Sequence, residues 1–285
     1  MKNLFTLFVF GFCLSASAYD VSVVSNGNFV GLYGDVQGSV YARGNLDIQN
    51  FEIRSTNDTY AVAVFGDVNV RNASISSLKT HARIGGKVKV SNGRIHVKKK
   101  GAPAHSLFLD IDHEVSDFID RAQALEAYNI PAYGNSSLTL NLHRPNRVSV
   151  VRIQASRLAR LRELTINGTK DDSLVIIVEG IYGEIRDLSI RLQGNIQTNR
   201  IAVVAPDALT FFATTSGLAS DLSNPVANRT GMPFTILAPH ADFTLTNGLL
   251  TGQIYAEDVR IGGDGQVNFG ILDWESFAKK PVVSN

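Results

Sequence analysis

Short runs of alternating apolar and polar residues recur along the first hundred residues, and they constrain the fold more than any other feature of the sequence. Val40, Ala42, Leu46 and Ile48 share one parity, whereas Tyr41 falls on the other. Strict alternation places one row of side chains in a core and the other row in solvent, as in a half-buried β-strand. We therefore expect a series of short strands. The alternation continues in four later pairs: Val62 and Val64, Val68 and Val70, Val88 and Val90, and Ile95 and Val97.

Residues that tolerate turn conformations separate these runs. The turn pairs are Gly34-Asp35, Gly66-Asp67, Gly85-Gly86 and Asn92-Gly93. Near the other end of the chain, residues 252–256 repeat the pattern of residues 38–42. Short strands with glycine turns favour a sandwich, a barrel or a β-solenoid, and the solenoid best suits many turns with few helices. We predict a mainly β fold with a β-helix or solenoid-like core.

The middle of the chain has a different periodicity. Apolar residues recur with helical spacing over residues 115–128, and Pro131 follows. A shorter helix is expected at 155–161, so that a helix-bearing insertion is predicted at about 110–165. The longer helix is expected to bury one stripe and to expose the opposite face. The stripe is Phe118, Ile119, Ala122 and Leu125, and the exposed face is Asp117, Asp120, Arg121 and Glu126.

Apolar runs follow this region. Residues 174–178 form a continuous apolar run, which predicts a strand buried on both faces. Further strands are expected at 201–204 and 234–237, and residues 214–231 are rich in Ser, Thr, Asn and Gly, which predicts a surface loop. Neither end of the chain alone has enough apolar strands to close a core. We therefore expect the N- and C-terminal strands to share one continuous β-core, with the longer helix packed against it.

The N-terminus carries the pattern of a secretory signal peptide. Lys2, an apolar run and the small residues 16–18 predict a signal peptide over residues 1–18, with a single β domain over 19–273 and a tail over 274–285. Cleavage would remove Cys13, the single cysteine, and would leave 26 basic residues (27 less Lys2) against 26 acidic ones. A neutral chain argues against binding of nucleic acid through bulk charge. No later run of apolar residues is long enough to predict a transmembrane segment.

Six phrases, in this order, resemble the bacterial choice-of-anchor A family, an adhesive domain of exported proteins. They are GSVYARGN at 38–45, VFGDV at 64–68, LVIIVEG at 174–180, ILAPHA at 236–241, GQIYA at 252–256 and GQVNF at 265–269. The resemblance covers about residues 29–269. It implies a β-helix-like domain with a helix-bearing insertion that acts in surface adhesion or ligand binding, and it supplies no catalytic residues. Family members carry an anchor after this domain, whereas a short tail follows here, so a secreted, periplasmic or cell-surface protein is expected.

Two charged clusters have both functional and structural interpretations. Asp110, Asp112 and Glu114 alternate as calcium ligands can, but the glycine and the final acid of a calcium loop are missing, so capping of the predicted helix is favoured. His96 and the lysines at 98–100, with Arg94 nearby, could bind phosphates or acidic glycans. Protection of a strand edge by these lysines is the favoured alternative.

A run of arginines and a set of tyrosines leave alternatives open. The arginines are suited to binding anionic ligands, but nearby acids could equally be their partners within the fold; they are Arg144, Arg147, Arg152, Arg157, Arg160 and Arg162. The tyrosines could form a binding surface or simply cover a sheet; they are Tyr41, Tyr60, Tyr182 and Tyr255.

The sequence therefore predicts a non-enzymatic, adhesin-like domain that binds an extracellular glycan or protein. Sequence patterns identify no catalytic, cofactor-binding or metal-ligating residue: the nucleophile motif Gly-x-Ser-x-Gly and paired histidine spacings are missing. The alternative is a β-helix polysaccharide lyase or hydrolase, because a groove lined with acids and arginines suits either role. Ice binding ranks last, since regular Thr-x-Thr ladders are missing.

Overall fold

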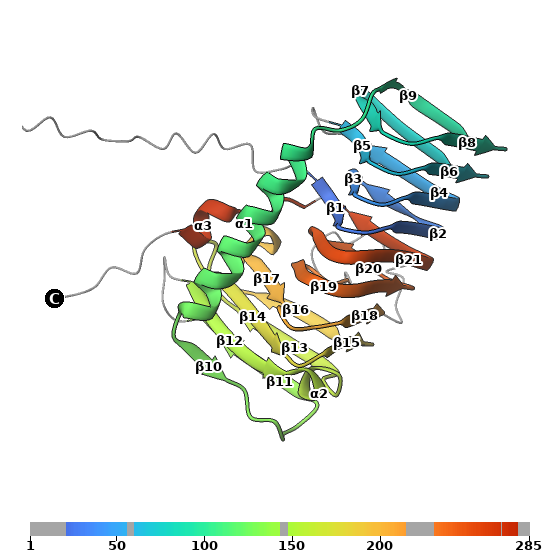
Figure 1. Cartoon of the computed structure of the whole chain (residues 1–285). Coiled ribbons are helices and arrows are strands. Elements are labelled where there is room, and N and C mark those ends of the chain that lie inside the picture. Colours follow the sequence, from blue (N-terminus) through green and yellow to red (C-terminus); the bar gives the residue numbers. More distant parts are fainter. Residues whose placement is uncertain (1–20, 56–59, 143–147, 215–230, 269, 279–285) are drawn as a thin grey trace, which may run out of the picture.

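The computed structural model describes residues 21–55, 60–142, 148–214, 231–268 and 270–278. The predicted signal peptide, and residues 215–230 of the predicted loop, lie outside these ranges. Strands dominate the described chain, and their pairings are parallel, so the chain coils into rungs that stack along one axis (Figure 1). The predicted mainly β, solenoid-like core is confirmed.

The strands align in three columns, which we call faces A, B and C. Face A contains β10 (Ala127–Asn129), β12 (Val148–Gln154), β14 (Ser173–Glu179), β17 (Ile201–Val204), the first parts of β19 (Thr235–Thr246) and β21 (Ile254–Asn268), then β1 (Val21–Ser25), β3 (Ser39–Ala42), β5 (Tyr60–Val64) and the second parts of β7 (Ser74–Ile84) and β9 (Arg94–Lys100).

Face B contains β15 (Tyr182–Arg186), β18 (Thr210–Thr214), the second part of β19, the middle of β21, the first halves of β2 (Phe29–Gln37) and β4 (Leu46–Ser55), then β6 (Val68–Arg71) and β8 (Val88–Ser91). Face C contains β11 (Ser137–Asn141), β13 (Glu163–Asn167) and β16 (Ser189–Gln193), and further along it β20 (Leu249–Thr251), the end of β21, the second halves of β2 and β4, and the first parts of β7 and β9.

The order of the rungs in space differs from their order in the sequence. The described part of the chain begins in the middle of the stack at β1 and builds rungs toward one end, where β8 and β9 lie (Figure 1). Helix α1 (His105–Ala124) then runs back along face A to the other end, from which β10 to β21 climb until β21 pairs with β1 and β2. The predicted sharing of one core by the N- and C-terminal strands is confirmed.

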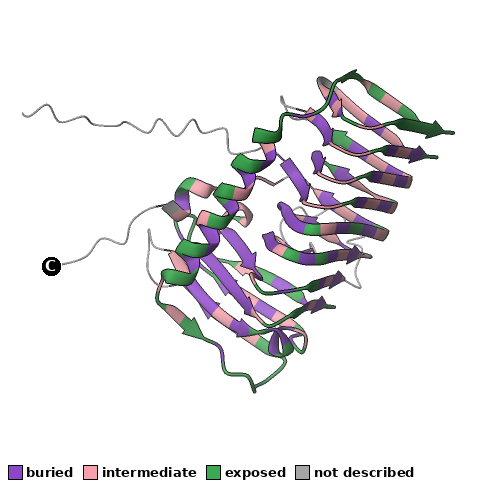
Figure 2. Cartoon of the chain, viewed as in Figure 1, coloured by how far each residue is buried: buried purple, intermediate pink, exposed green. Residues whose placement is uncertain are grey.

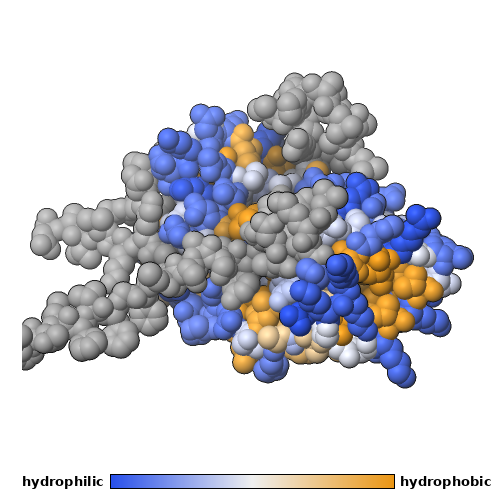
Figure 3. Space-filling model, turned by 90° about the horizontal axis from the view of Figure 1, so that it is seen from above, coloured by the Kyte–Doolittle hydropathy of each residue, from blue (hydrophilic) through white to orange (hydrophobic). Residues whose placement is uncertain are grey.

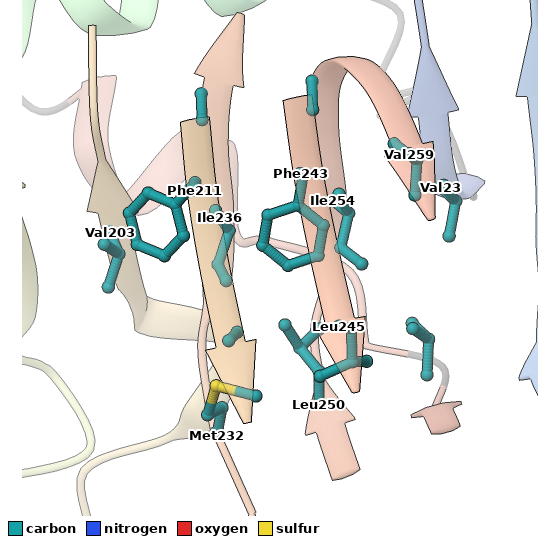
Figure 4. Close-up of a cluster of buried hydrophobic side chains, with 14 of the residues drawn as sticks. Val23, Val203, Phe211, Met232, Ile236, Phe243, Leu245, Leu250, Ile254 and Val259 are labelled. Carbon is teal, nitrogen blue, oxygen red and sulfur yellow. The ribbon is translucent and has the colours of Figure 1, made fainter. Parts of the chain in front are cut away.

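Inward-pointing side chains form one continuous core. Val40, Leu46 and Ile48 are fully buried in it, as the alternation predicts. Figure 4 shows how such side chains stack from rung to rung, with Phe211 beside Phe243 and Ile236 beside Ile254. Each rung therefore supplies apolar surface that a single rung could not bury alone.

From β12 to β5, face A is buried on its outer side as well, because α1 covers it (Figure 2). Tyr41 is expected in solvent from its parity, but it lies under α1 against Phe108, with ring centroids 6.1 Å apart. The side chains of β14 point alternately to the two sides of the strand. Ile176 packs in the solenoid core, and Val175 packs in the apolar layer between face A and α1. The prediction that this strand is buried on both faces is therefore confirmed.

A ladder of Asn and Asp side chains fixes the corner between faces A and B. The amide N–H of Asn45 donates to Asn28 Oδ1 at 2.9 Å, that of Asp67 to Asn45 Oδ1 at 2.8 Å, and that of Lys87 to Asp67 Oδ1 at 2.7 Å. A glycine precedes each of these residues. At Gly44, a Cβ would lie 2.5 Å from Asn28 Oδ1, so a side chain there would disrupt the corner.

Helix α1 begins earlier than the sequence predicts. It spans His105–Ala124 rather than residues 115–128, and Ala104 occupies its N-cap position. Phe118, Ile119 and Ala122 are buried as predicted, whereas Leu125 follows the helix and is half-buried. The rest of the predicted insertion differs too: strands β10 to β13 return to the solenoid, and the second helix, α2, is the single turn Ala155–Leu158.

A polar contact and an aromatic cluster attach α1 to the solenoid. Asp112 pairs with Arg43 and accepts a hydrogen bond from the Tyr255 hydroxyl at 2.6 Å, so the helix is joined to two rungs. Phe118 packs edge-on against Trp274 and Phe277, with ring centroids 5.2 and 5.1 Å apart. These two residues belong to α3 (Trp274–Ala278), so the first part of the segment expected as a tail packs against α1. Residues 279–285 lie outside the described part of the chain.

Truncation of Phe118 tests how far α1 contributes to stability. Phe118 is 7% exposed and contacts α3, so Phe118→Ala should lower the free energy of unfolding by about 3–5 kcal/mol. Asp120→Ala is the control, because Asp120 is exposed on the same helix and its loss should change stability by less than about 0.5 kcal/mol. Urea unfolding of both variants measures the difference, and equal small losses would show that α1 is peripheral.

Candidate functional site

An open groove of about 950 Å³ lies on face C, where β21, β2, β4, β7 and β9 are stacked. One row of its lining comes from residues that are register partners on successive rungs. This row is Gln266, Asp35, Glu52, Ser74 and Arg94. Gln37 and Arg54 line the groove two residues further along their strands. Because neighbouring strands lie about 4.8 Å apart, the groove presents a polar side chain at each rung along the axis.

The carboxylates of Asp35 and Glu52 each accept a hydrogen bond from a side chain two residues further along the same strand. Arg54 Nη2 donates to Glu52 Oε2 at 2.6 Å, and Gln37 Nε2 donates to Asp35 Oδ2 at 3.5 Å. Burial raises the pKa of Asp35 above its ordinary value, against the lowering effects of Gln37 and Arg54. The hydrogen bond from Arg54 lowers the pKa of Glu52. Two carboxylates on neighbouring rungs therefore differ in how readily they take up a proton.

The corner between faces B and C forms one wall of the groove. Asn50, Asn72 and Asn92 line it, and each has a positive φ, between 46° and 51°. Asparagine tolerates this conformation. Tyr33 occupies the equivalent corner of β2 with φ 57° and is 55% exposed. A bulky residue at positive φ stores strain, and such strain concentrates at functional sites.

The lining can make repeated hydrogen bonds to one extended ligand. Carboxylates accept, the guanidinium groups of Arg54 and Arg94 donate, and the amides of Gln37 and Gln266 do both. Charges of both signs are present, so the groove does not select strongly for an anion or a cation. Such a surface suits a polymer that presents hydroxyl groups at a regular repeat.

The structure separates the acidic residues that the sequence predicts as a cluster. Asp112 pairs with Arg43 beneath α1, whereas Asp110 and Glu114 are exposed. The prediction that they cap the helix is wrong, because the helix begins at His105 and its first turn contains no acidic residue. Partial desolvation of its carboxyl group by neighbouring atoms, together with the negative charge of Asp110, raises the pKa of Glu114. In the described ranges, no three His, Cys, Asp or Glu side chains gather as a metal site would need.

The arginine run mainly binds backbone carbonyls near the end of the stack that contains β10 and β11. Arg157 donates to the carbonyl of Asn135, Arg160 to that of Ala132 at 2.7 Å, and Arg162 to that of Arg186 at 2.8 Å. Arg152 contacts Gln123 O at 2.8 Å and Glu179 at 3.6 Å. These partners lie within the fold, but most are backbone carbonyls rather than the nearby acids of the structural alternative. Arg144 and Arg147 lie outside the described residues.

The four tyrosines do not form one surface. Tyr41 and Tyr255 are buried beneath α1, and Tyr60 is half-buried beside them. Tyr182 is exposed on face B, several rungs away. The interpretation that these tyrosines cover a sheet is therefore confirmed for Tyr41, Tyr60 and Tyr255. The exposed tyrosine beside the groove is instead Tyr33.

Sequence reasoning missed the groove, although an internal repeat marks it. Residues 50–54 (NFEIR), 72–76 (NASIS) and 92–96 (NGRIH) align as Asn, any residue, polar, Ile, polar. The Asn forms the corner, the Ile points into the core, and the polar residues flanking the Ile face the groove side. Alignment of the three segments would have identified the polar residues as one outward row.

No helix in the described ranges combines the length and the hydropathy that a bilayer crossing requires. A family model described as "Putative Ice-binding-like adhesive domain" matches residues 15–269. This match confirms the resemblance to an adhesive domain family. No curated protein matches the chain.

Three solved structures are similar to the chain at low sequence identity. The ice-binding protein LeIBP from an Arctic yeast is 14% identical with a TM-score of 0.48, over 94% of this chain and 96% of that one. An ice-binding protein from the Antarctic ascomycete Antarctomyces psychrotrophicus is 14% identical with a TM-score of 0.44, over 90% and 97%. An ice-binding protein from an Antarctic biological consortium is 12% identical with a TM-score of 0.38, over 94% of each chain.

The two groove carboxylates should affect stability in opposite directions. A raised pKa means that the folded state binds more protons at Asp35, so its carboxylate costs stability as the pH rises through the raised pKa. Asp35→Asn should therefore increase the free energy of unfolding at pH 7, with no gain at about pH 3, where the carboxyl is protonated in both states. The pKa of Glu52 is lowered, so Glu52→Gln should decrease stability at pH 7. Urea unfolding at both pH values measures this, and changes of equal sign would contradict the assignment.

Proposed function

Since the chain belongs to the family of ice-binding-like adhesive domains, we propose that it is an exported bacterial adhesin-like domain that binds an extracellular glycan in the face C groove. Binding without turnover accords with the adhesive family. Support for export comes from the predicted signal peptide and from a mature chain without cysteine. The ligand class is inferred from the groove.

The row of polar side chains carries this proposal. Gln266, Asp35, Glu52, Ser74 and Arg94 recur once per rung along the groove. The rung spacing of about 4.8 Å is close to the length of one pyranose unit in an extended chain. Successive sugars could therefore make equivalent hydrogen bonds on successive rungs. The exposed ring of Tyr33 adds an aromatic surface of the kind that sugars stack on.

A glycan fits this groove better than a folded protein does. Protein interfaces have an apolar core surrounded by a polar rim, whereas charged and amide side chains dominate the lining here. The large aromatic residue in the lining, Phe51, is 3% exposed and belongs to the core. A ligand in the groove would meet mainly hydrogen-bonding groups.

One observation favours the alternative of a polysaccharide lyase or hydrolase. Asp35 and Glu52 lie on neighbouring rungs, and their pKa values are displaced in opposite directions, as acid–base pairs require. Incubation with neutral and acidic polysaccharides, followed by assays for reducing ends and unsaturated products, tests it. Turnover that Asp35→Asn or Glu52→Gln abolishes would replace the binding-only proposal.

Face B does not favour ice binding. Its outward rows include threonines on β18 and β19, but charged residues occupy the rungs on both sides. Glu184 and Arg186 lie on β15, and Arg260 and Asp47 lie on β21 and β4. A flat, regular threonine array is therefore interrupted within two rungs.

The groove proposal predicts that Arg54 and Arg71 differ in their effect on binding. Both arginines pair with a carboxylate, and their side chains are 59% and 52% exposed, but Arg54 lines the groove and Arg71 lies on face B. The glycans on an array that bind the purified domain should bind the Arg54→Ala variant at least about tenfold more weakly, a loss of about 1.4 kcal/mol. Arg71→Ala should bind as the unmodified chain does. Calorimetric titration gives the affinities.

Tyr33→Asn provides a second variant with an independent readout. Asparagine tolerates positive φ, so this substitution should leave stability unchanged or increase it by up to about 1 kcal/mol, while loss of the ring weakens glycan binding. Equal effects of Arg54→Ala and Arg71→Ala on glycan binding would place the ligand outside the groove. Full retention of binding by both Arg54→Ala and Tyr33→Asn would do the same.

A further inference from the structure

The last rung of the N-terminal half ends the stack with an unpaired strand edge. This terminal rung, residues 81–100, consists of the second part of β7 with β8 and β9. Among the described residues, β8 pairs with β6 alone and β9 with β7 alone. The outer N–H and C=O groups of both strands are therefore available to another strand.

The hydrophobic core is open at this end. Val88 and Val90 point inward but are 36% and 44% exposed, whereas Val68 and Val70, their register partners one rung below, are fully buried. Figure 3 looks down on this end and shows apolar surface bordered by hydrophilic side chains. The opposite end differs, because Arg157 and Arg160 bind carbonyls of the segment between β10 and β11, and Ile130 is buried there. Another rung-like segment would complete the core at the terminal rung.

The charge around the terminal rung has one sign. Residues 81–100 contain seven Lys and Arg residues and no Asp or Glu, although the whole chain is almost neutral. In the described part of the chain, none of these seven forms an ion pair with a carboxylate. Desolvation and the positive charges of Lys100, Lys98 and Arg83 lower the pKa of His81. The rung thus has an excess of positive charge, and the nearest carboxylate, that of Asp67, accepts a hydrogen bond from the Lys87 backbone rather than pairing with a side chain of the rung.

These features together identify the chemistry of a partner. A second copy that brought the same end would oppose seven positive charges with seven more, which is repulsive. An acidic polysaccharide would match the charge but would use neither the open strand edge nor the exposed valines. An extended polypeptide with alternating acidic and apolar residues satisfies all three features, because strand addition uses backbone hydrogen bonds for affinity and alternate side chains for specificity.

We propose that the terminal rung is a docking site for an acidic polypeptide segment, which adds as a further strand along β8 and β9 and covers Val88 and Val90. The lysines then have two effects. They prevent the edge from pairing with copies of itself, and they select a partner of opposite charge.

A synthetic peptide tests the proposal with the full domain. The probe is a fluorescent heptapeptide in which Glu and Val alternate, with both ends blocked, and its binding is followed by anisotropy at low and high salt. Binding at low salt is expected, with weakening as salt increases. A Lys/Val version of the peptide should not bind. Lys89→Glu should weaken binding by about tenfold, whereas Lys170→Glu, at an exposed turn distant in the chain, should have no effect.

The backbone requirement separates strand addition from simple charge attraction. The same peptide N-methylated at every residue keeps its charge but cannot donate backbone hydrogen bonds, so it should lose binding by at least about tenfold. Amide hydrogen exchange should slow within residues 88–97, over the stretch that the seven-residue peptide pairs with, when the unmodified peptide is bound. Equal binding of the two peptides, no binding of the unmodified peptide at low salt, or protection elsewhere on the domain would overturn the proposal.

Discussion

Parallel pairing of β21 with β1 and β2 is the contact on which the rest of the structure depends. It brings together segments about 230 residues apart in the sequence, with Phe29 opposite Val259 and Val36 opposite Val267. Without this seam, the N-terminal and C-terminal rungs would be two short stacks, each with an additional open end. The seam also builds the groove, because Gln266 comes from one side of it, and Asp35 and Glu52 come from the other.

The pairing of β21 with β1 and β2 in turn requires helix α1. The chain can return to the seam only if a segment carries it from one end of the stack to the other, and α1 does so along face A. Where α1 lies over the face, the outer side chains of the strands are mainly apolar, and the helix buries them. The Asp112–Arg43–Tyr255 contact joins the helix to rungs on both sides of the seam, since Arg43 follows β3 and Tyr255 lies in β21. The helix leaves faces B and C uncovered.

Local patterns predicted what depends on near neighbours in the sequence. The alternation of Val40, Leu46 and Ile48, and the continuous run at 174–178, follow from the pleat of a strand and needed no tertiary information. The burial of Tyr41 and the role of Asp112 could not be found in this way, because both depend on which face α1 covers. The start of α1 was missed since apolar residues before Val115, such as Phe108 and Ile111, continue the buried stripe without a capping residue. The groove depends on register across the seam, which the Asn-x-polar-Ile-polar repeat indicates for only part of its length.

Amide hydrogen exchange of the unliganded domain tests most directly the claim that the chain forms one solenoid closed at the seam. Stability in a stack of rungs is approximately a sum of nearest-neighbour contacts, so interior strands should open last and terminal strands first. Strands β2 and β21 should therefore show equal protection, the highest in the chain, and should lose it together as denaturant is added, whereas β8 and β9 should exchange early. Early exchange at β2 and β21 while the rungs on either side stay protected would show that the two halves fold as separate units, and it would contradict the account.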